Sequence, residues 1–414
     1  MQQAFPSTTP GQLLGYDQWR HALARVPLPA AVVDLDAFDR NVSLFTAALA
    51  QAGGKQRIRL ATKSVRVPAL IRRVLDASPV FQGLMAYCST EAAFLASEGF
   101  NDLLIAYPSV QASDLAILRA IHERGVTIRL MIDSLEQALI INDAMNGVAK
   151  PFELALDIDM SLRFLSGRVH LGVRRSPIRS VESAMNVIRA VAKLPNVRCR
   201  SAMGYEAQVA GLGDENPFKK RLAPVARMVR KMSRTRIARL REEFAHSMQK
   251  EGTPLELFNG GGSGSITYTA TEPWLTELTI GSGLLCSHLF SYFSNIRPEP
   301  ACFFVLPVVR TSDAGYVTCQ GGGYIASGEP GWDKVPVPYL PSGLKLVAME
   351  GCGEVQTPLL VEQGTTVGLA DPVLFRHAKA GELAEHFNTY HLVAHGRIVD
   401  EVPTYRGRGC SFIG

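Results

Sequence analysis

The sequence predicts an α/β protein with an N-terminal (β/α)8 barrel of the TIM type followed by a C-terminal all-β domain. Short apolar runs, typical of buried strands, alternate with helical patterns over about 230 residues, which is the size of such a barrel. Beyond residue 270 the chain changes to short apolar runs broken by Gly and Pro, which is typical of an all-β domain. We therefore expect an N-terminal arm at 1–26, the barrel at 27–270 and the β domain at 271–414.

The barrel strands are expected in chain order. The first, Ala30–Asp36, is a short apolar run, and the helical pattern after it ends at Gly53 and Gly54. The second ends near Lys63, where alternating residues give way to a helix around Pro68. The other six strands are expected at residues 83–88, 103–106, 127–132, 152–158, 197–203 and 255–258. An open doubly wound sheet is the competing fold, and it is disfavoured because no Gly-x-Gly-x-x-Gly follows the first strand.

A long basic segment, 218–251, precedes the last of these strands. Its apolar residues recur at three- and four-residue spacing, which predicts one or two amphipathic helices. The basic face could bind nucleic acid, but a solvated helix face is the commoner explanation, and we expect no nucleic-acid partner. In the β domain, strands are expected at 303–309, 315–319, 344–350, 366–369, 389–394 and 397–402.

The composition is that of an ordinary globular chain. Of 414 residues, 47% are hydrophobic and 20% are charged, and the net charge of +5 gives no reason to invoke nucleic acid. Seven scattered cysteines without a Cys-x-x-Cys pair favour reduced thiols, and hence the cytoplasm. The N-terminus does not resemble a signal peptide, and no apolar run approaches the roughly 20 residues needed to span a bilayer. We expect a cytoplasmic protein without a membrane partner.

Lys63 is the first residue whose position suggests chemistry. It lies at the C-terminal end of a predicted barrel strand, and in α/β barrels the active site gathers at that end. A desolvated lysine can be neutral at pH 7 and can attack an aldehyde to form a Schiff base. Taken alone, its position is also that of an ordinary solvated lysine at the end of a strand.

The second such feature is a glycine-rich loop directly after the eighth predicted strand. Its members are Gly260, Gly261, Gly262, Ser263 and Gly264. Glycines let successive backbone N–H groups point into one concavity, and such a nest binds phosphate. A flexible hinge between the domains is the alternative. A lysine and a phosphate site facing each other across the barrel mouth would suit a phosphorylated aldehyde, of which pyridoxal 5′-phosphate is the common one.

Four stretches of the chain carry a resemblance to a known family: Pro29–Asp36, Ala61–Ser64, Ser89–Ala92 and Ile398–Pro403. Through them the chain resembles the alanine-racemase-type (fold type III) enzymes that use pyridoxal 5′-phosphate. It is most similar to their D-threonine aldolase and D-serine dehydratase branch, in the group labelled amino-acid deaminase/aldolase. The resemblance implies that Lys63 is the Schiff-base lysine and that the glycine loop holds the phosphate. It also implies a homodimer in which the partner's β domain completes the barrel mouth.

Further site residues are implied by the same resemblance. The family places a tyrosine against the cofactor ring, and Tyr205, at the end of the seventh strand, is the candidate; a core aromatic is the alternative. It also places an arginine near the pyridine nitrogen, for which both Arg163 and Arg174 qualify. An arginine there would leave the ring unprotonated and a weaker electron sink.

The divalent metal of this branch is expected to be absent. The family's His-x-Cys or His-x-Asp site corresponds here to His377-Ala378-Lys379, and an ammonium has no lone pair for a metal. Glu382 and His386 could join His377 as a substitute set, although an ordinary charged helix is the simpler interpretation. Without metal, His377 and Lys379 could act on the substrate as an acid and a charge clamp.

These features favour a lyase acting on an amino acid, by aldol cleavage or by dehydration and deamination of a D-β-hydroxy amino acid. An amino-acid racemase on the same barrel is the alternative, and it would need a second base such as Tyr268 or Tyr292. A non-catalytic pyridoxal-phosphate carrier is a third hypothesis, and it is disfavoured because such proteins usually lack a large second domain.

Overall fold

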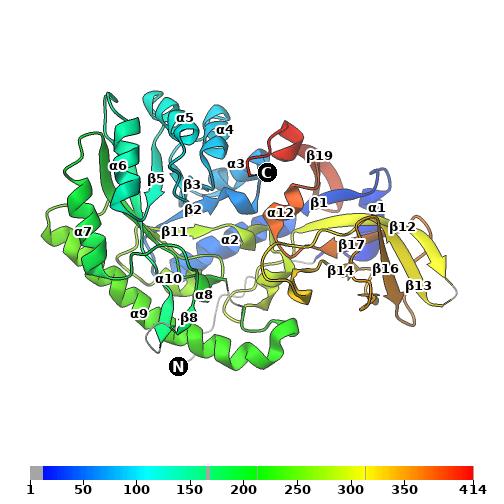
Figure 1. The fold of residues 1–414 in the computed structure, drawn as a ribbon. Helices are drawn as coiled ribbons and strands as arrows, with labels where there is room; N and C mark the ends of the chain where they lie inside the picture. Colours follow the sequence, from blue (N-terminus) through cyan, green and yellow to red (C-terminus); the bar gives the residue numbers. More distant parts are fainter. Residues whose placement is uncertain (1–12, 165–167, 212, 313, 414) are drawn as a thin grey trace.

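Two sheets organise the computed structural model, which describes residues 13–164, 168–211, 213–312 and 314–413 (Figure 1). One sheet closes into a barrel surrounded by helices, and the other is rich in antiparallel pairs and lies beside it. The predicted fold class, a TIM-type barrel with a β domain, is confirmed.

The barrel is made of eight strands that pair in parallel all the way round. In order they are β2 (Arg57–Ala61), β3 (Phe81–Ala86), β4 (Leu103–Ile105), β5 (Ile128–Ile132), β6 (Phe152–Asp157), β9 (Val197–Gly204), β10 (Leu257–Gly260) and β11 (Glu277–Ile280). Leu104, Met131 and Met203 are among the side chains that fill the barrel interior. A larger apolar cluster packs the outside of the strands against helices, which explains why the strands read as nearly continuous apolar runs.

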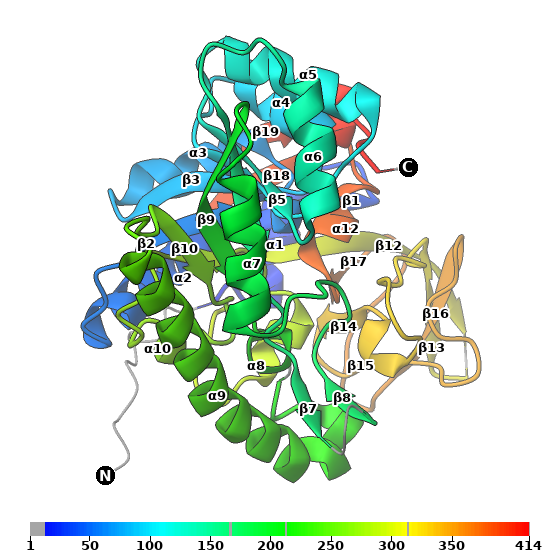
Figure 2. The same ribbon diagram turned by 60° about the vertical axis from the view of Figure 1, so that its left-hand side comes forward.

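Helices cover the barrel from outside (Figure 2). The longer ones are α2 (Leu35–Gln51), α3 (Pro68–Ala77), α4 (Ser89–Ser97), α5 (Ala112–Glu123), α6 (Leu135–Ala144), α7 (Val181–Val191) and α9 (Ala223–Lys250). Several begin at a residue whose side chain caps the first turn, as Asp34 does for α2 and Ser134 for α6. The basic segment forms the 3-10 helix η3 (Pro217–Leu222) and the 28-residue helix α9, which packs beside α7.

Shorter elements connect these strands and helices. They are α1 (Tyr16–Leu23), η1 (Thr62–Ser64), β7 (Leu162–Phe164), β8 (Val169–Leu171), α8 (Ala207–Ala210), α10 (Ile266–Thr269), α11 (Ser282–Leu285), η4 (His288–Tyr292), η5 (Trp332–Lys334), α12 (Ala380–Ala384) and η6 (Arg406–Arg408). No helix within the described ranges is long and apolar enough to cross a bilayer.

The second sheet has nine strands. They are β1 (Ala30–Asp34), β12 (Cys302–Ser312), β13 (Tyr316–Gln320), β14 (Val337–Leu340), β15 (Leu344–Leu346), β16 (Gln356–Val361), β17 (Pro372–Arg376), β18 (Thr389–Ala394) and β19 (Arg397–Pro403). The main path is β15-β16-β13-β12-β1-β18-β19, with β17 paired to β12 and β14.

Three expectations about strands that were made from the sequence are wrong. Ala30–Asp36 was expected to open the barrel, yet β1 lies inside the second sheet, antiparallel to β12 and parallel to β18. Its residues are all buried, and such a run fits a central strand of either sheet. The eighth barrel strand is instead β11, at 277–280, so the two sheets do not divide the chain at residue 270. The strand expected at 366–369 is absent there, and β16 and β17 flank that segment.

The second sheet and its connections also touch the end of β2. Helix α12 packs against η1, and the carboxylate of Glu385 forms an ion pair with the guanidinium of Arg66. Near the C-terminus, the Tyr405 N–H donates to the Arg66 carbonyl at 2.9 Å, and the Tyr405 hydroxyl donates to Glu91 at 3.0 Å. The start of the barrel is thereby tied to the last part of the chain.

Candidate active site

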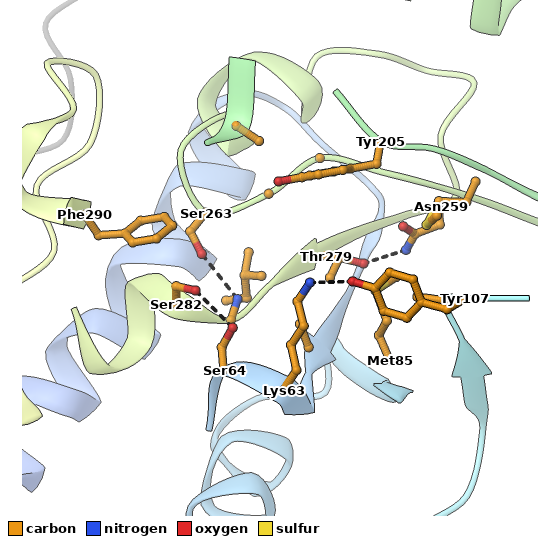
Figure 3. Close-up of a pocket in the computed structure, with 18 of the residues that line it drawn as sticks. Lys63, Ser64, Met85, Tyr107, Tyr205, Asn259, Ser263, Thr279, Ser282 and Phe290 are labelled. Carbon is orange, nitrogen blue, oxygen red and sulfur yellow. Dashed lines mark hydrogen bonds between the residues drawn. The ribbon is translucent and has the colours of Figure 1, made fainter. Parts of the chain in front are cut away.

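A cavity opens at the C-terminal ends of the barrel strands (Figure 3). Its wall comes from the ends of β2, β3, β9, β10 and β11 and from the loops that follow β4, β8, β10 and β11. Because side chains from strands far apart in the sequence meet at this end of an α/β barrel, it is the expected place for an active site.

Lys63 lies in this wall, in the short η1 helix directly after β2. Its side chain extends into the cavity, and its Nζ lies 2.8 Å from the hydroxyl of Tyr107 (Figure 3). The backbone behind it is fixed, because Arg66 Nε donates to the Lys63 carbonyl at 3.1 Å. Gly381 of α12 approaches the same carbonyl so closely that any Cβ there would overlap it. The lysine thus has an immobilised backbone and an amine that faces the cavity.

Tyr107 and Arg175 form one part of the wall that the sequence did not predict. Burial opposes ionisation of the Tyr107 phenol, but the nearby Lys63 and Arg175 cations outweigh it and lower the pKa of Tyr107. Behind them, burial and the neighbouring Asp133 carboxylate raise the pKa of Asp157 to about 7. The only available signal for Tyr107 was its position two residues after the short strand β4.

The glycine loop follows β10 as the sequence predicted, and three of its residues line the cavity: Gly261, Gly262 and Ser263. A Cβ on Gly262 would lie only 2.7 Å from Ala210 Cβ, so the close approach of the two backbones requires glycine. Gly260 and Gly264 lie outside the cavity lining. Gly260 packs against Arg241, while the Gly264 carbonyl accepts from Asn295 at 3.1 Å.

A second loop, after β11, completes the cradle. The Oγ atom of Ser263 accepts from the N–H groups of Gly281 and Gly283 at 3.2 and 3.1 Å. The hydroxyls of Ser64 and Ser282 lie 2.9 Å apart beside them (Figure 3). This end of the cavity is therefore rich in hydroxyl and N–H groups. The sequence analysis missed this loop because it assigned residues after 270 to the β domain.

A buried ion-pair network holds the glycine loop in shape. Arg241 is fully buried and pairs with Glu206 and, at 2.7 Å, with Glu272. The Glu206 carboxylate in turn accepts from the Gly261 N–H at 3.1 Å and from the Ser265 hydroxyl at 2.8 Å. Separating these groups would leave a buried charge without its partner, which is energetically costly. The network is therefore expected to hold the glycine loop rigidly.

Tyr205 lines the cavity on the side opposite Lys63, at the end of β9 (Figure 3). Burial and then the adjacent Glu206 carboxylate raise its pKa to about 12, so the phenol keeps its proton at neutral pH. Its ring offers a flat face to the cavity.

Neither arginine considered from the sequence lines the cavity. Arg163 Nε donates to His170 Nδ1 at 2.8 Å within the β7–β8 hairpin, and Arg174 is exposed. The arginine in the cavity wall is Arg175.

His377 and Lys379 lie outside the cavity wall. His377 is buried, and burial and the neighbouring Arg376 lower its pKa to about 3, so the ring is neutral. Lys379 Nζ donates to Ser327 Oγ at 2.7 Å and pairs with Glu382 at 3.1 Å. His386 packs against the Tyr324 ring, with the ring centres 4.6 Å apart.

These residues do not fit a divalent metal. The Lys379 ammonium offers no lone pair, and Glu382, the nearest carboxylate, is already bound to it. In the part of the chain that the structure describes, no three His, Cys, Asp or Glu side chains are grouped so that they could hold an ion.

The cavity does fit pyridoxal 5′-phosphate. It offers a lysine amine for the aldehyde, a glycine-lined cradle with serine hydroxyls for the phosphate, and the aromatic face of Tyr205 opposite the lysine.

Comparisons with known proteins agree with this interpretation. The family model described as "Alanine racemase, N-terminal domain" matches residues 33–284. No curated protein sequence matches the chain. Among solved structures, D-threonine aldolase from Filomicrobium marinum superposes with a TM-score of 0.79 at 20% identity, over 94% of this chain and 97% of that one.

Two further structures are similar over 92% of this chain and 98% of their own. D-threo-3-hydroxyaspartate dehydratase from Delftia sp. HT23 has a TM-score of 0.74 at 16% identity. Alanine racemase from Bacillus anthracis has a TM-score of 0.60 at 13% identity. The family model covers more than half of the chain, from β1 to α11, and includes Lys63 and both cradle loops. The chain therefore belongs to the alanine racemase N-terminal domain family of fold type III pyridoxal-phosphate enzymes.

Proposed function

We propose that the protein is a pyridoxal-phosphate-dependent lyase that acts on a β-hydroxy amino acid of D configuration and binds its cofactor covalently at Lys63. One observation carries the proposal: the Lys63 amine and the glycine cradle with its serine hydroxyls line the same cavity. The choice of a lyase is supported by the better superposition on the aldolase and the dehydratase than on the racemase, with TM-scores of 0.79 and 0.74 against 0.60.

Each part of the cavity has a role in holding the cofactor. The hydroxyls of Ser64, Ser263 and Ser282 can rotate to donate to the phosphate, next to the backbone of the glycine loop. Tyr205 packs against the face of the ring and, as a neutral phenol, adds no charge. Arg175 is the arginine that we propose beside the ring.

The chemistry is divided between the cofactor and Lys63. When bound, pyridoxal 5′-phosphate draws electrons from the substrate Cα and makes a bond to that carbon easier to break. Once the substrate amine has taken the place of Lys63 on the cofactor, the Lys63 amine would be free inside the cavity. There it would move a proton at the reacting carbon. We assign no step to His377 or Lys379, since neither lines the cavity and Lys379 is bound to Glu382.

The cofactor assignment is tested by trapping. Purified protein incubated with pyridoxal 5′-phosphate and reduced with borohydride should carry one phosphopyridoxyl group on the peptide that contains Lys63, as seen by mass spectrometry. Lys63→Ala should carry none, while Lys379→Ala should be labelled like the native chain. Labelling of Lys63→Ala at the native level, or labelling of the native chain at another lysine instead of Lys63, would contradict the proposal.

The reaction is tested with a panel of D- and L-β-hydroxy amino acids. Release of an aldehyde and glycine indicates aldol cleavage, and release of a keto acid and ammonia indicates dehydration with deamination. Exchange of the α-hydrogen with deuterated water, with inversion and without either product, would identify a racemase and overturn the lyase assignment. Since both lyases and racemases use this barrel, product analysis decides between them.

We further propose that the protein acts as a homodimer in which the partner's second sheet covers the cavity mouth. Exposed apolar side chains follow one another at helical spacing on η3 and α9: Phe218, Leu222, Val225, Met228 and Met232, each 43 to 56% exposed. Such a row is unusual on a free helix face. Phe218 also packs edge-on against Tyr292 of η4, the helix that brings Phe290 to the cavity. Light scattering should give twice the chain mass, and charged substitutions in the row should halve it.

A further inference from the structure

Tyr107 lines the cavity beside Arg175, but it has no role in the function proposed so far. Tyr107 follows β4 and Lys63 follows β2, so the barrel brings together two residues from strands that are not neighbours. Their reacting atoms, Lys63 Nζ and Tyr107 Oη, lie 2.8 Å apart, and the two side chains point toward one another (Figure 3). We propose that Tyr107, with Arg175 beside it, takes the proton that Lys63 must lose before it attacks the cofactor aldehyde.

The geometry supports a proton transfer between these two atoms. A distance of 2.8 Å is that of a direct hydrogen bond, without an intervening water. Nζ lies 5.4 Å from the centre of the Tyr107 ring, and the guanidinium carbon of Arg175 lies 5.5 Å from the same centre. All three side chains line the cavity, so the proton stays beside the place where the amine reacts.

The charges around Tyr107 favour its phenolate. Lys63 faces it from the end of β2 and Arg175 from the loop after β8, and these cations outweigh the burial that opposes ionisation. Tyr205 faces it from β9 as a neutral phenol. The nearby carboxyl group of Asp157, at the end of β6, interacts with Arg175 and is only partly ionised near neutral pH, because burial and Asp133 raise its pKa to about 7.

The two tyrosines of the cavity therefore differ in kind. The pKa of Tyr205 is raised to about 12 by burial and Glu206, whereas that of Tyr107 is lowered by its two cations. Groups of one type whose environments separate their pKa values commonly divide the tasks of an active site. Here Tyr205 would serve as a packing surface and Tyr107 as the proton acceptor.

The step balances without another reactant. One proton moves from the Lys63 ammonium to the Tyr107 phenolate, which leaves a neutral amine and a neutral phenol. Only the neutral amine has the lone pair that attacks an aldehyde. The inference rests on the proposed function for its purpose, but the pairing of Tyr107 with Lys63 and Arg175 is a property of the protein without cofactor.

The pairing is tested on protein freed of cofactor, by following phenolate absorbance as the pH is raised. Among the 11 tyrosines, one should ionise before the rest. That early step should be lost in Tyr107→Phe and kept in Tyr316→Phe, which alters an exposed tyrosine of β13. It should move to higher pH in Lys63→Met and in Arg175→Met, which remove a cation, and stay in Lys63→Arg, which keeps one. The pairing is contradicted if the early step persists in Tyr107→Phe, or if its pH is unchanged in both Lys63→Met and Arg175→Met. Because the variants are independent, the test still decides if one of them fails to fold.

The proton transfer is tested by the rate at which the cofactor attaches to Lys63, sampled by borohydride quenching. A positioned proton acceptor contributes about a hundredfold or more to such steps, so Tyr107→Phe should attach at least about a hundred times more slowly at neutral pH. The difference should shrink as the pH rises, because hydroxide and solvent then remove the proton. Equal rates of cofactor attachment in the native chain and in Tyr107→Phe would show that Tyr107 does not accept the proton. If the native chain never attaches the cofactor, the proposed function fails, whereas the phenolate titration still decides the pairing.

Discussion

At the scale of single residues, the cavity is supported by a buried carboxyl group that does not reach it. Glu91 accepts from the Tyr87 N–H at 2.7 Å and from the Tyr405 hydroxyl at 3.0 Å, directly behind the end of β2. Burial raises its pKa to about 7, although its hydrogen bonds favour the charged form. The group therefore changes charge in the native protein near neutral pH, where an unfolded glutamate is already ionised.

This predicts a pH dependence of stability with a definite sign. Because the native pKa lies above the unfolded one, the native chain holds a proton that the unfolded chain has lost, and the resulting stabilisation is lost as the pH rises through about 7. Glu91→Gln cannot ionise; its amide oxygen can still accept from the Tyr87 N–H, while its amide N–H would donate to the Tyr405 hydroxyl. The free energy of unfolding of this variant should therefore fall less than that of the native chain, by about 1 to 3 kcal/mol, between about pH 5 and 8. Urea denaturation at both pH values measures it. Asp157 contributes a decline of the same sign, so the variant should retain part of the slope. An identical slope in both proteins would contradict the assignment.

At the scale of elements, two strand-to-helix loops form the cradle, and their fit depends on the absence of side chains. The loop after β10 meets α8 at Gly262 and Ala210, while the loop after β11 meets η1 at Gly281, where a Cβ would lie 3.0 Å from Ala61 Cβ and Ser64 Cβ. The segments are close because neighbouring strands of a parallel barrel end at the same level. A donor-rich site thus requires small residues on both loops.

The fit can be tested by a pair of compensating substitutions. Gly262→Ala adds a methyl group 2.7 Å from Ala210 Cβ and should weaken cofactor binding about tenfold or more, since a shift of the loop displaces its donors. Adding Ala210→Gly removes the colliding atom and should recover most of the affinity. Fluorescence titration with pyridoxal 5′-phosphate compares the three proteins. Failure of the double variant to improve on Gly262→Ala would show that the collision is not the cause.

Much of this element-level arrangement could be predicted from the sequence. The strand end at Lys63 and the glycine loop stand out through their composition, and both line one cavity. Tyr107 and Arg175 could not be singled out from the sequence. Tyr107 follows a strand of only three residues, and Arg175 lies in a loop that has no apolar periodicity to mark its position. The assignment of β1 to the barrel failed because β1 is fully buried, and a fully buried strand can belong to either sheet. The loop after β11 was not predicted, because the strand at 255–258 was taken as the last strand of the barrel.

The metal prediction also belongs to this scale. Lys379, Ser327 and Glu382 bind one another at the start of α12, where the resemblance implied a ligand for a divalent ion. Treatment with a chelator is therefore expected to leave turnover unchanged, and added manganese or zinc should not raise it. Loss of activity on chelation, restored by one of these ions, would contradict this expectation.

At the scale of the whole molecule, the chain crosses between the two sheets more than once. It enters through β1 of the second sheet, completes the barrel with β2 to β11, and returns to the second sheet from β12 onward. β1 pairs with β12 and β18, strands more than 250 residues away. The two sheets are thus parts of one topological unit, even though each has its own strand order.

A fragment comprising residues 27–270 should therefore not fold on its own. It lacks β11, which closes the barrel between β10 and β2, and it leaves β1 without either neighbour. Unpaired strand edges of this kind promote aggregation. Circular dichroism should show no cooperative thermal transition for the fragment and a clear one for the full chain. A sharp transition in the fragment would show that the barrel is independent.

The close approach of Gly381 to the Lys63 carbonyl has a thermodynamic consequence. The segment that presents the Lys63 amine is held in place by a residue more than 300 positions later, so a cofactor bound at Lys63, as proposed, would also stabilise a contact between the two sheets. A ligand that binds only the native state raises stability with its free concentration. Pyridoxal 5′-phosphate would then link the first and last thirds of the chain, and its free concentration would set the stability of the contact between them.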